Sequence, residues 1–113
     1  KGDIIAAIGI PLVGKDVLEK NELIVTLSDV KKLREKNYIK EILPVGSKGI
    51  KYEAEILAEM SKCKLRFKKN LGLDVKGSAG PGTVVLVSLS EDNYLNLRKD
   101  FSYKTINLIA KLI

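Results

Sequence analysis

Residues 39 to 62 read IKEILPVGSKGIKYEAEILAEMSK, a short apolar run followed by small residues and then by a longer periodic segment. The apolar run predicts a strand over Ile39–Pro44. The periodic segment predicts a helix over Ile50–Lys62, whose buried stripe would be Ile50, Ala54, Leu57, Ala58 and Ser61. The glycines at 46 and 49 allow the tight turn that this strand-to-helix unit needs.

Two other segments indicate strands that are covered on both faces. Nearly every side chain from Asp3 to Ile8 is apolar, and the run from Thr83 to Leu89 is rich in valine and leucine. We therefore place Thr83–Leu89 near the centre of the sheet. We also expect strands at 23–27, 65–67 and 105–113, a helical turn at 16–20, and loops at 9–14 and 77–82; residues 71–75 have no clear assignment.

Two further helices are expected from their end signals. Ser28 serves as the predicted N-cap of the first, which carries lysines toward its C-terminal end. Ser90 serves as the predicted N-cap of the second. The expected inward residues of the first are Val30, Leu33 and Asn37, and the end charges of the second are Glu91, Asp92, Arg98 and Lys99.

The order of these elements defines the expected fold class. Helices alternate with mostly single strands, which indicates an α+β domain with a mixed β-sheet, packed helices and a ferredoxin-like arrangement. A chain of 113 residues forms one domain, 1–113. Because it opens at Lys1 directly in a buried strand, we expect it to be cut from a longer protein.

Composition excludes several kinds of chemistry. The chain has no histidine and one cysteine, so histidine-based triads and internal disulfides are ruled out, and a reducing cytoplasm is the expected compartment. The net charge of +6 suits an anionic ligand, but the lysines are spread along the chain and only 5% of residues are aromatic. A lysine-rich surface is therefore favoured over a nucleic-acid site, and no segment has the length of a membrane span.

Two glycine-bearing loops are candidates for ligand binding. Gly46, Ser47, Lys48 and Gly49 lie where a strand gives way to a helix, whose free N–H groups would hold a phosphate or carboxylate. The spacing is not that of a Walker A motif. From the pattern alone, a plain turn with Ser47 as N-cap is the simpler interpretation, and ordinary turn chemistry equally explains the loop over residues 78–83.

Several motifs in their order resemble the C-terminal domain of the AIR synthase (aminoimidazole ribonucleotide synthetase) and selenophosphate synthetase superfamily. They are the opening strand Gly2–Gly9, the segment Ile42–Ile50, the helix Tyr52–Met60, the loop Ser78–Thr83 with the strand after it, and the closing strand Ile106–Ile113. The pair Pro-Val-Gly-Ser-x-Gly and Ser-Ala-Gly-Pro-x-Thr is most similar to the α-ribazole kinases (α-ribazole-5′-phosphate synthases). Pro44–Gly49 departs from AIR synthase itself, which favours a divergent member.

This resemblance implies an ATP-dependent phosphoryl transfer, with α-ribazole converted to α-ribazole-5′-phosphate in cobalamin lower-ligand salvage. It implies that ATP and Mg²⁺ are held mainly by an N-terminal domain outside this chain, so these residues alone would be inactive. The implied substrate is a ribonucleoside or ribonucleotide, and the implied full-length protein is a homodimer. The residues implied as substrate or phosphate contacts are Gly46, Ser47, Lys48, Gly49, Ser78, Gly80 and Thr83.

Two alternatives come from other functional classes. The chain could be a free-standing ferredoxin-like module that binds a ligand or RNA without catalysis, or a purely structural assembly domain. Tight binding of single-stranded RNA with a steep salt dependence would favour the RNA-binding module. Sedimentation with and without phosphate ligands would address the assembly domain.

Overall fold

The computed structural model describes residues 2–9, 26–46, 48–68 and 84–113. These residues contain five strands, which are β1 (Asp3–Gly9), β2 (Ile39–Pro44), β3 (Leu65–Phe67), β4 (Val84–Ser90) and β5 (Ile106–Leu112). They also contain the helices α2 (Leu27–Arg34), α3 (Gly49–Met60) and α4 (Tyr94–Asp100), with a short 3₁₀ turn, η2 (Glu91–Asn93), immediately before α4.

The strands form one sheet in the order β2-β4-β1-β5-β3, and every neighbouring pair is antiparallel. The α+β class is confirmed, whereas the expected mixture of parallel and antiparallel pairs is wrong for the described strands. The reason lies in the connections. Helix α2 links β1 to β2, which run in the same direction with β4 between them, and α4 likewise links β4 to β5 with β1 between them. These two split units form the ferredoxin-like arrangement.

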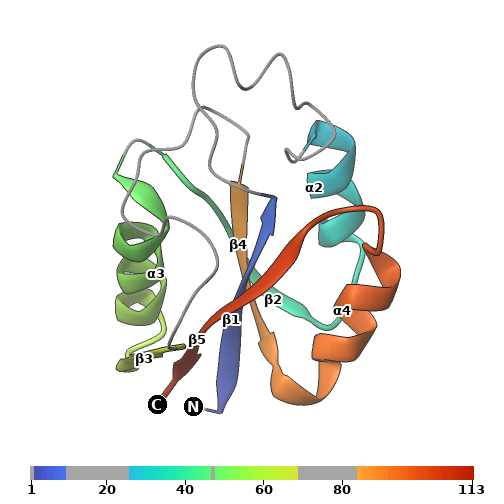
Figure 1. Cartoon of the computed structure of the whole chain (residues 1–113). Helices are drawn as coiled ribbons and strands as arrows, with labels where there is room; N and C mark the ends of the chain where they lie inside the picture. The colour runs from blue at the N-terminus through green and yellow to red at the C-terminus, as the bar shows by residue number, and fades with distance from the viewer. Residues whose placement is uncertain (1, 10–25, 47, 69–83) are drawn as a thin grey trace.

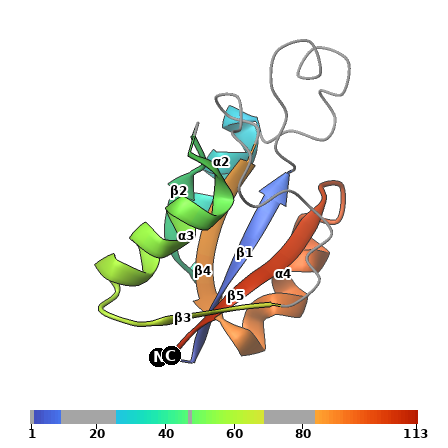
Figure 2. The ribbon, with the colours of Figure 1, turned by 60° about the vertical axis from the view of Figure 1, so that its left-hand side comes forward.

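The helices cover the sheet on both faces. Figure 1 shows α3 on one side and α2 with α4 on the other, and Figure 2 shows the same three layers from a second direction. Side chains of β1 alternate between the layers, with Ile5 in the α3 core and Ile4 in the core beneath α2 and α4. Because both layers are filled, Ile4 to Ile8 are all buried, as the continuous apolar run predicted.

Strand β4 confirms the prediction for the valine-rich run. It lies inside the sheet between β2 and β1, and Val84 to Leu89 are all buried. The strands predicted at 39–44 and 65–67 are also confirmed, and the closing strand runs from Ile106 to Leu112 within the predicted 105–113.

The first helix starts earlier than predicted. Its N-cap is Thr26, so the expected N-cap at Ser28 is wrong, and Leu27 belongs to the helix rather than to a strand at 23–27. The Thr26 hydroxyl accepts from the Asp29 N–H at 3.2 Å, and the Asp29 carboxylate accepts from the Thr26 N–H at 2.9 Å. This reciprocal capping box needs an acceptor three residues after the N-cap. Ser28 has Lys31 at that position, which can only donate.

The other helix ends also differ in detail. Helix α3 ends at Met60, so Ser61 is its exposed C-cap and not part of the buried stripe, while Ile50, Ala54, Leu57 and Ala58 are buried as predicted. Asn37 lies beyond α2 and is exposed. Ser90 precedes η2 rather than α4 directly, and Arg98 and Lys99 occupy the last turn of α4 as expected.

Several predictions concern residues outside the described part of the chain. These are the helical turn at 16–20, the segment 71–75 and the loops at 10–14 and 77–82. Within the described part, no helix is long and apolar enough to cross a membrane.

Candidate functional site

One end of the sheet brings together the ends of four strands. Gly9 pairs with Val84, and its N–H donates to the Thr105 carbonyl oxygen at 2.8 Å, just before β5. The Val45 N–H donates to the Val84 carbonyl oxygen at 3.0 Å, just after β2. The described strand ends next to the predicted loops at 9–14 and 77–82 therefore lie beside the turn between β2 and α3 (Figure 1).

The turn from Pro44 to Gly49 is fixed at both ends and open in the middle. Val45 is buried in the α3 core, and the Gly49 N–H donates to the Gly46 carbonyl oxygen at 3.1 Å. Gly46 is exposed, and a Cβ added to it would meet nothing within 4 Å. Gly49 has a φ of +90°, which a residue with a side chain rarely adopts. Gly46 therefore leaves the backbone of the turn accessible, whereas Gly49 allows the backbone to adopt a positive φ.

Lys48, rather than Ser47, is the N-cap of α3, so the interpretation of Ser47 as a capping residue is wrong. The Lys48 side chain makes no capping hydrogen bond; its ammonium lies 4.7 Å from the centroid of the Tyr52 ring, one turn along the helix. Lys48 and Tyr52 are both exposed. The start of α3 therefore combines the positive end of a helix dipole with an accessible cation.

The sequence-predicted site residues are only partly placed. Gly46, Lys48 and Gly49 lie together at the start of α3. Ser47, Ser78, Gly80 and Thr83 fall outside the described residues. Thr83 directly precedes Val84, whose pairing with Gly9 belongs to the same end of the sheet.

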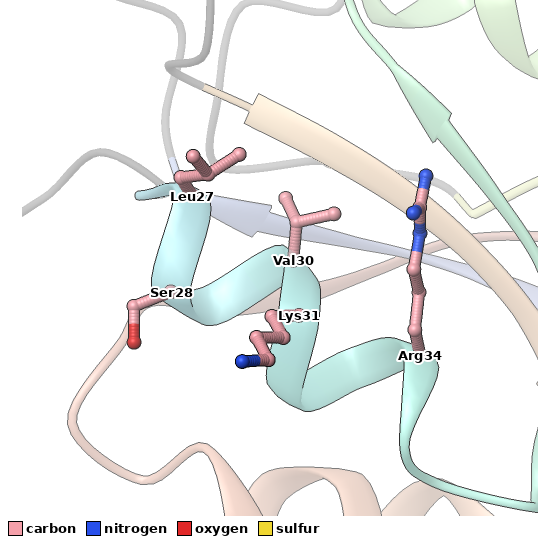
Figure 3. A pocket seen from close by; sticks show the side chains of 5 residues that line it. All are labelled: Leu27, Ser28, Val30, Lys31 and Arg34. Carbon is pink, nitrogen blue, oxygen red and sulfur yellow. The ribbon is translucent and has the colours of Figure 1, made fainter.

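A second feature was missed by the sequence reasoning. A pocket of about 470 Å³ is lined by one face of α2, and its described residues are Leu27, Ser28, Val30, Lys31 and Arg34. Figure 3 shows Leu27, Val30 and Arg34 projecting toward the same side of the helix. The spacing of 27, 30, 31 and 34 is that of one helical face, and this was the available signal.

Asp29 ties the start of α2 to the connection between α4 and β5. It is 4% exposed, accepts from the Tyr103 hydroxyl at 2.9 Å and pairs with the Lys104 ammonium at 3.5 Å. Burial alone raises the pKa of Asp29, but the hydrogen bonds from Thr26 and Tyr103 and the charge of Lys104 outweigh it, so the pKa lies below its ordinary value.

Asp100 makes similar polar contacts near the C-terminal end of α2. Its carboxylate accepts from the Tyr38 hydroxyl at 2.7 Å and lies 3.7 Å from the Lys36 ammonium. The Tyr38 hydrogen bond, helped by the nearby lysine charges, lowers the pKa of Asp100 despite some desolvation. Burial and the same carboxylate raise the pKa of Tyr38. Helix α2 is thus held at both ends by residues distant in sequence.

The fold of this chain also occurs in a protein of known structure. No protein-family model matches the chain, and no curated protein sequence matches it. Among solved structures, the chain is similar to E. coli HypE, a hydrogenase maturation protein, with a TM-score of 0.69 and 16% sequence identity. The match covers 99% of this chain, which spans 43% of the HypE chain.

The match confirms the expected α+β fold class. At 16% identity the likeness concerns the fold alone.

Proposed function

We propose that the chain is the C-terminal, substrate-side domain of a two-domain, ATP-dependent enzyme of the AIR synthase-related superfamily. The observation that carries this proposal is the match of nearly the whole chain to less than half of the HypE chain. The open glycine turn at the start of α3, on the end of the sheet where four strands meet, supports it as the place of ligand contact.

The turn has the chemistry to bind an anionic group of a substrate. N–H groups at the start of a helix favour a phosphate or carboxylate, and the exposed Lys48 adds a full positive charge. Gly46 leaves room for close approach because it has no side chain. We assign these residues to binding and orientation of a phosphate-bearing ligand.

The described residues do not fit a Mg²⁺ site. No group of three or more acidic, cysteine or histidine side chains gathers among them, so no step of the reaction is assigned to the metal here. In the proposed enzyme, ATP and Mg²⁺ are held mainly by the other domain. This chain then closes the substrate side of the cleft.

The finer proposal concerns the substrate. The Pro-Val-Gly-Ser-x-Gly and Ser-Ala-Gly-Pro-x-Thr motifs favour α-ribazole, phosphorylated to α-ribazole-5′-phosphate by a cytoplasmic homodimer. The same motifs keep Ser47, Ser78, Gly80 and Thr83 as proposed contacts beside Gly46, Lys48 and Gly49.

The test uses the full-length protein with ATP, Mg²⁺ and α-ribazole, and follows formation of α-ribazole-5′-phosphate by mass spectrometry. Gly46→Val and Lys48→Gln are expected to raise the substrate KM about tenfold, because each removes access or charge at the turn. Lys64→Gln, an exposed lysine after α3, is the matched control and leaves KM unchanged. Gly49→Val is unsuitable, since its positive φ would strain the fold.

Two results would contradict the proposal. Absence of ATP-dependent product with α-ribazole and with other ribonucleosides would remove the enzymatic assignment. Tight, strongly salt-dependent binding of single-stranded RNA without turnover would favour the RNA-binding module instead.

A further inference from the structure

We infer that the pocket on α2 binds a phosphate monoester whose phosphate contacts Lys31 and Arg34 and whose apolar body covers Leu27 and Val30. This site is distinct from the turn at the start of α3, because α2 and α3 lie on opposite faces of the sheet (Figure 1). It goes beyond the proposed function, which does not use α2.

The four cations of the basic run at residues 31–36 fall into two pairs with different contacts. Lys32 donates to the Asp100 carbonyl oxygen at 2.7 Å and lies 4.7 Å from the Phe101 ring centroid, and Lys36 pairs with the Asp100 carboxylate. These two lysines hold α2 against the α4–β5 connection. Lys31 and Arg34 instead line the pocket, and neither forms an ion pair with an acidic side chain in the described part of the chain.

Apolar side chains line the pocket beside Lys31 and Arg34. Leu27 is an apolar side chain that is 87% exposed, and Val30 lies one turn further along the same face. A planar guanidinium and an ammonium are donors that a phosphate group accepts from, while a purely apolar ligand would leave both charges unused.

The pocket has a rigid helical wall and the volume of a small-molecule site. The capping box and the Asp29–Lys104 pair fix the first turn of α2, and the contacts to Asp100 fix its end, so the pocket face is held in place before a ligand arrives. A volume of about 470 Å³ falls within the range of small-molecule sites. The expected ligand is therefore a small phosphorylated molecule.

The experiment is calorimetric titration of the full-length protein with phenyl phosphate, inorganic phosphate and benzoate. Phenyl phosphate should bind more tightly than inorganic phosphate, because of its ring, and more tightly than benzoate, because of its second charge. The double variant Lys31→Gln/Arg34→Gln should weaken phenyl phosphate binding by about tenfold or more. Lys99→Gln, an exposed lysine in the last turn of α4, should leave it unchanged.

Loss of affinity in Lys48→Gln but not in the double variant would overturn this inference and place the ligand at the α3 turn. Equal binding of inorganic phosphate or of benzoate would overturn the assigned ligand class, and absence of binding at millimolar concentration would overturn the site itself. Thermal melting of the double variant separates these outcomes from unfolding. None of them depends on α-ribazole turnover, so the two proposals fail independently.

Discussion

At the scale of single residues, Asp29 connects the start of α2 to the segment between α4 and β5. It accepts hydrogen bonds from Thr26, three residues before it, and from Tyr103, 74 residues after it, and it pairs with a lysine whose side chain is 7% exposed. A buried charge is tolerated only when it is paired and hydrogen-bonded. Asp29 therefore makes the position of α2 depend on the α4–β5 connection.

Asp29→Asn is expected to lower the free energy of unfolding by roughly 3 kcal/mol, because it removes the buried carboxylate charge that accepts from Thr26 and Tyr103 and faces the Lys104 ammonium. Guanidinium denaturation followed by circular dichroism measures the change. Asp92→Asn, at an exposed acid in η2, serves as the control and should change stability by less than about 0.5 kcal/mol. Equal stability of the two variants would show that the pair contributes nothing.

At the scale of elements, the helices differ in how they attach to the sheet. Among the described residues, helix α3 makes no ion pair to the sheet and relies on its apolar stripe, in which Ile50, Ala54 and Leu57 are fully buried. Helix α2 buries Leu33 but is fixed largely by polar contacts at its two ends. The orientation of α3, which carries the candidate turn, therefore depends on packing.

Leu57→Ala should lower the free energy of unfolding by about 2–5 kcal/mol, since it leaves a cavity between α3 and the sheet. Leu95→Ala removes the same atoms from a side chain that is 75% exposed on α4 and should be nearly neutral. Denaturant midpoints of the two variants, measured with unchanged m-values, provide the comparison. A stable Leu57→Ala variant would mean that α3 is not held by this stripe.

At the scale of the whole molecule, the two carboxylates that anchor α2 make folding depend on pH. The pKa values of Asp29 and Asp100 lie below those of an unfolded chain, so the unfolded state binds protons first as the pH falls. The stabilisation is complete above the ordinary carboxyl pKa, near 4, and is lost as the pH drops through the folded values. The pKa values of Tyr38 and Tyr103 are raised, which predicts a second loss above about pH 10.

Free energies of unfolding measured from pH 7 down to pH 2 should stay level to about pH 5 and then decline. In the Asp29→Asn variant the decline should be shallower, because one of the two shifted carboxyl groups is absent. An identical slope in both proteins would contradict the assignment of the low pKa to Asp29.

Much of the fold follows from short-range patterns in the sequence. The burial of an element's faces determines the spacing of its apolar residues, and this spacing can be seen among neighbours in the sequence. Examples are the apolar run of β1, the valine-rich run of β4 and the apolar stripe of α3. The glycine turn was predicted in the same way, from small residues between a strand and a helix, and its role in ligand binding stays a prediction.

Only the tertiary structure decided how these elements are combined and which charges have partners. The antiparallel order arises because β4 and β1 are inserted between strands joined by helices, and the N-cap at Thr26 depends on an acid that Tyr103 and Lys104 also bind. The tertiary structure also distinguishes Lys32 and Lys36, which contact Asp100, from Lys31 and Arg34, which line a pocket. These contacts join residues that are 60 to 75 positions apart, so they leave no periodic pattern in the sequence. The basic run therefore looks uniform in the sequence, although in the structure two of its cations contact Asp100 and two line the pocket.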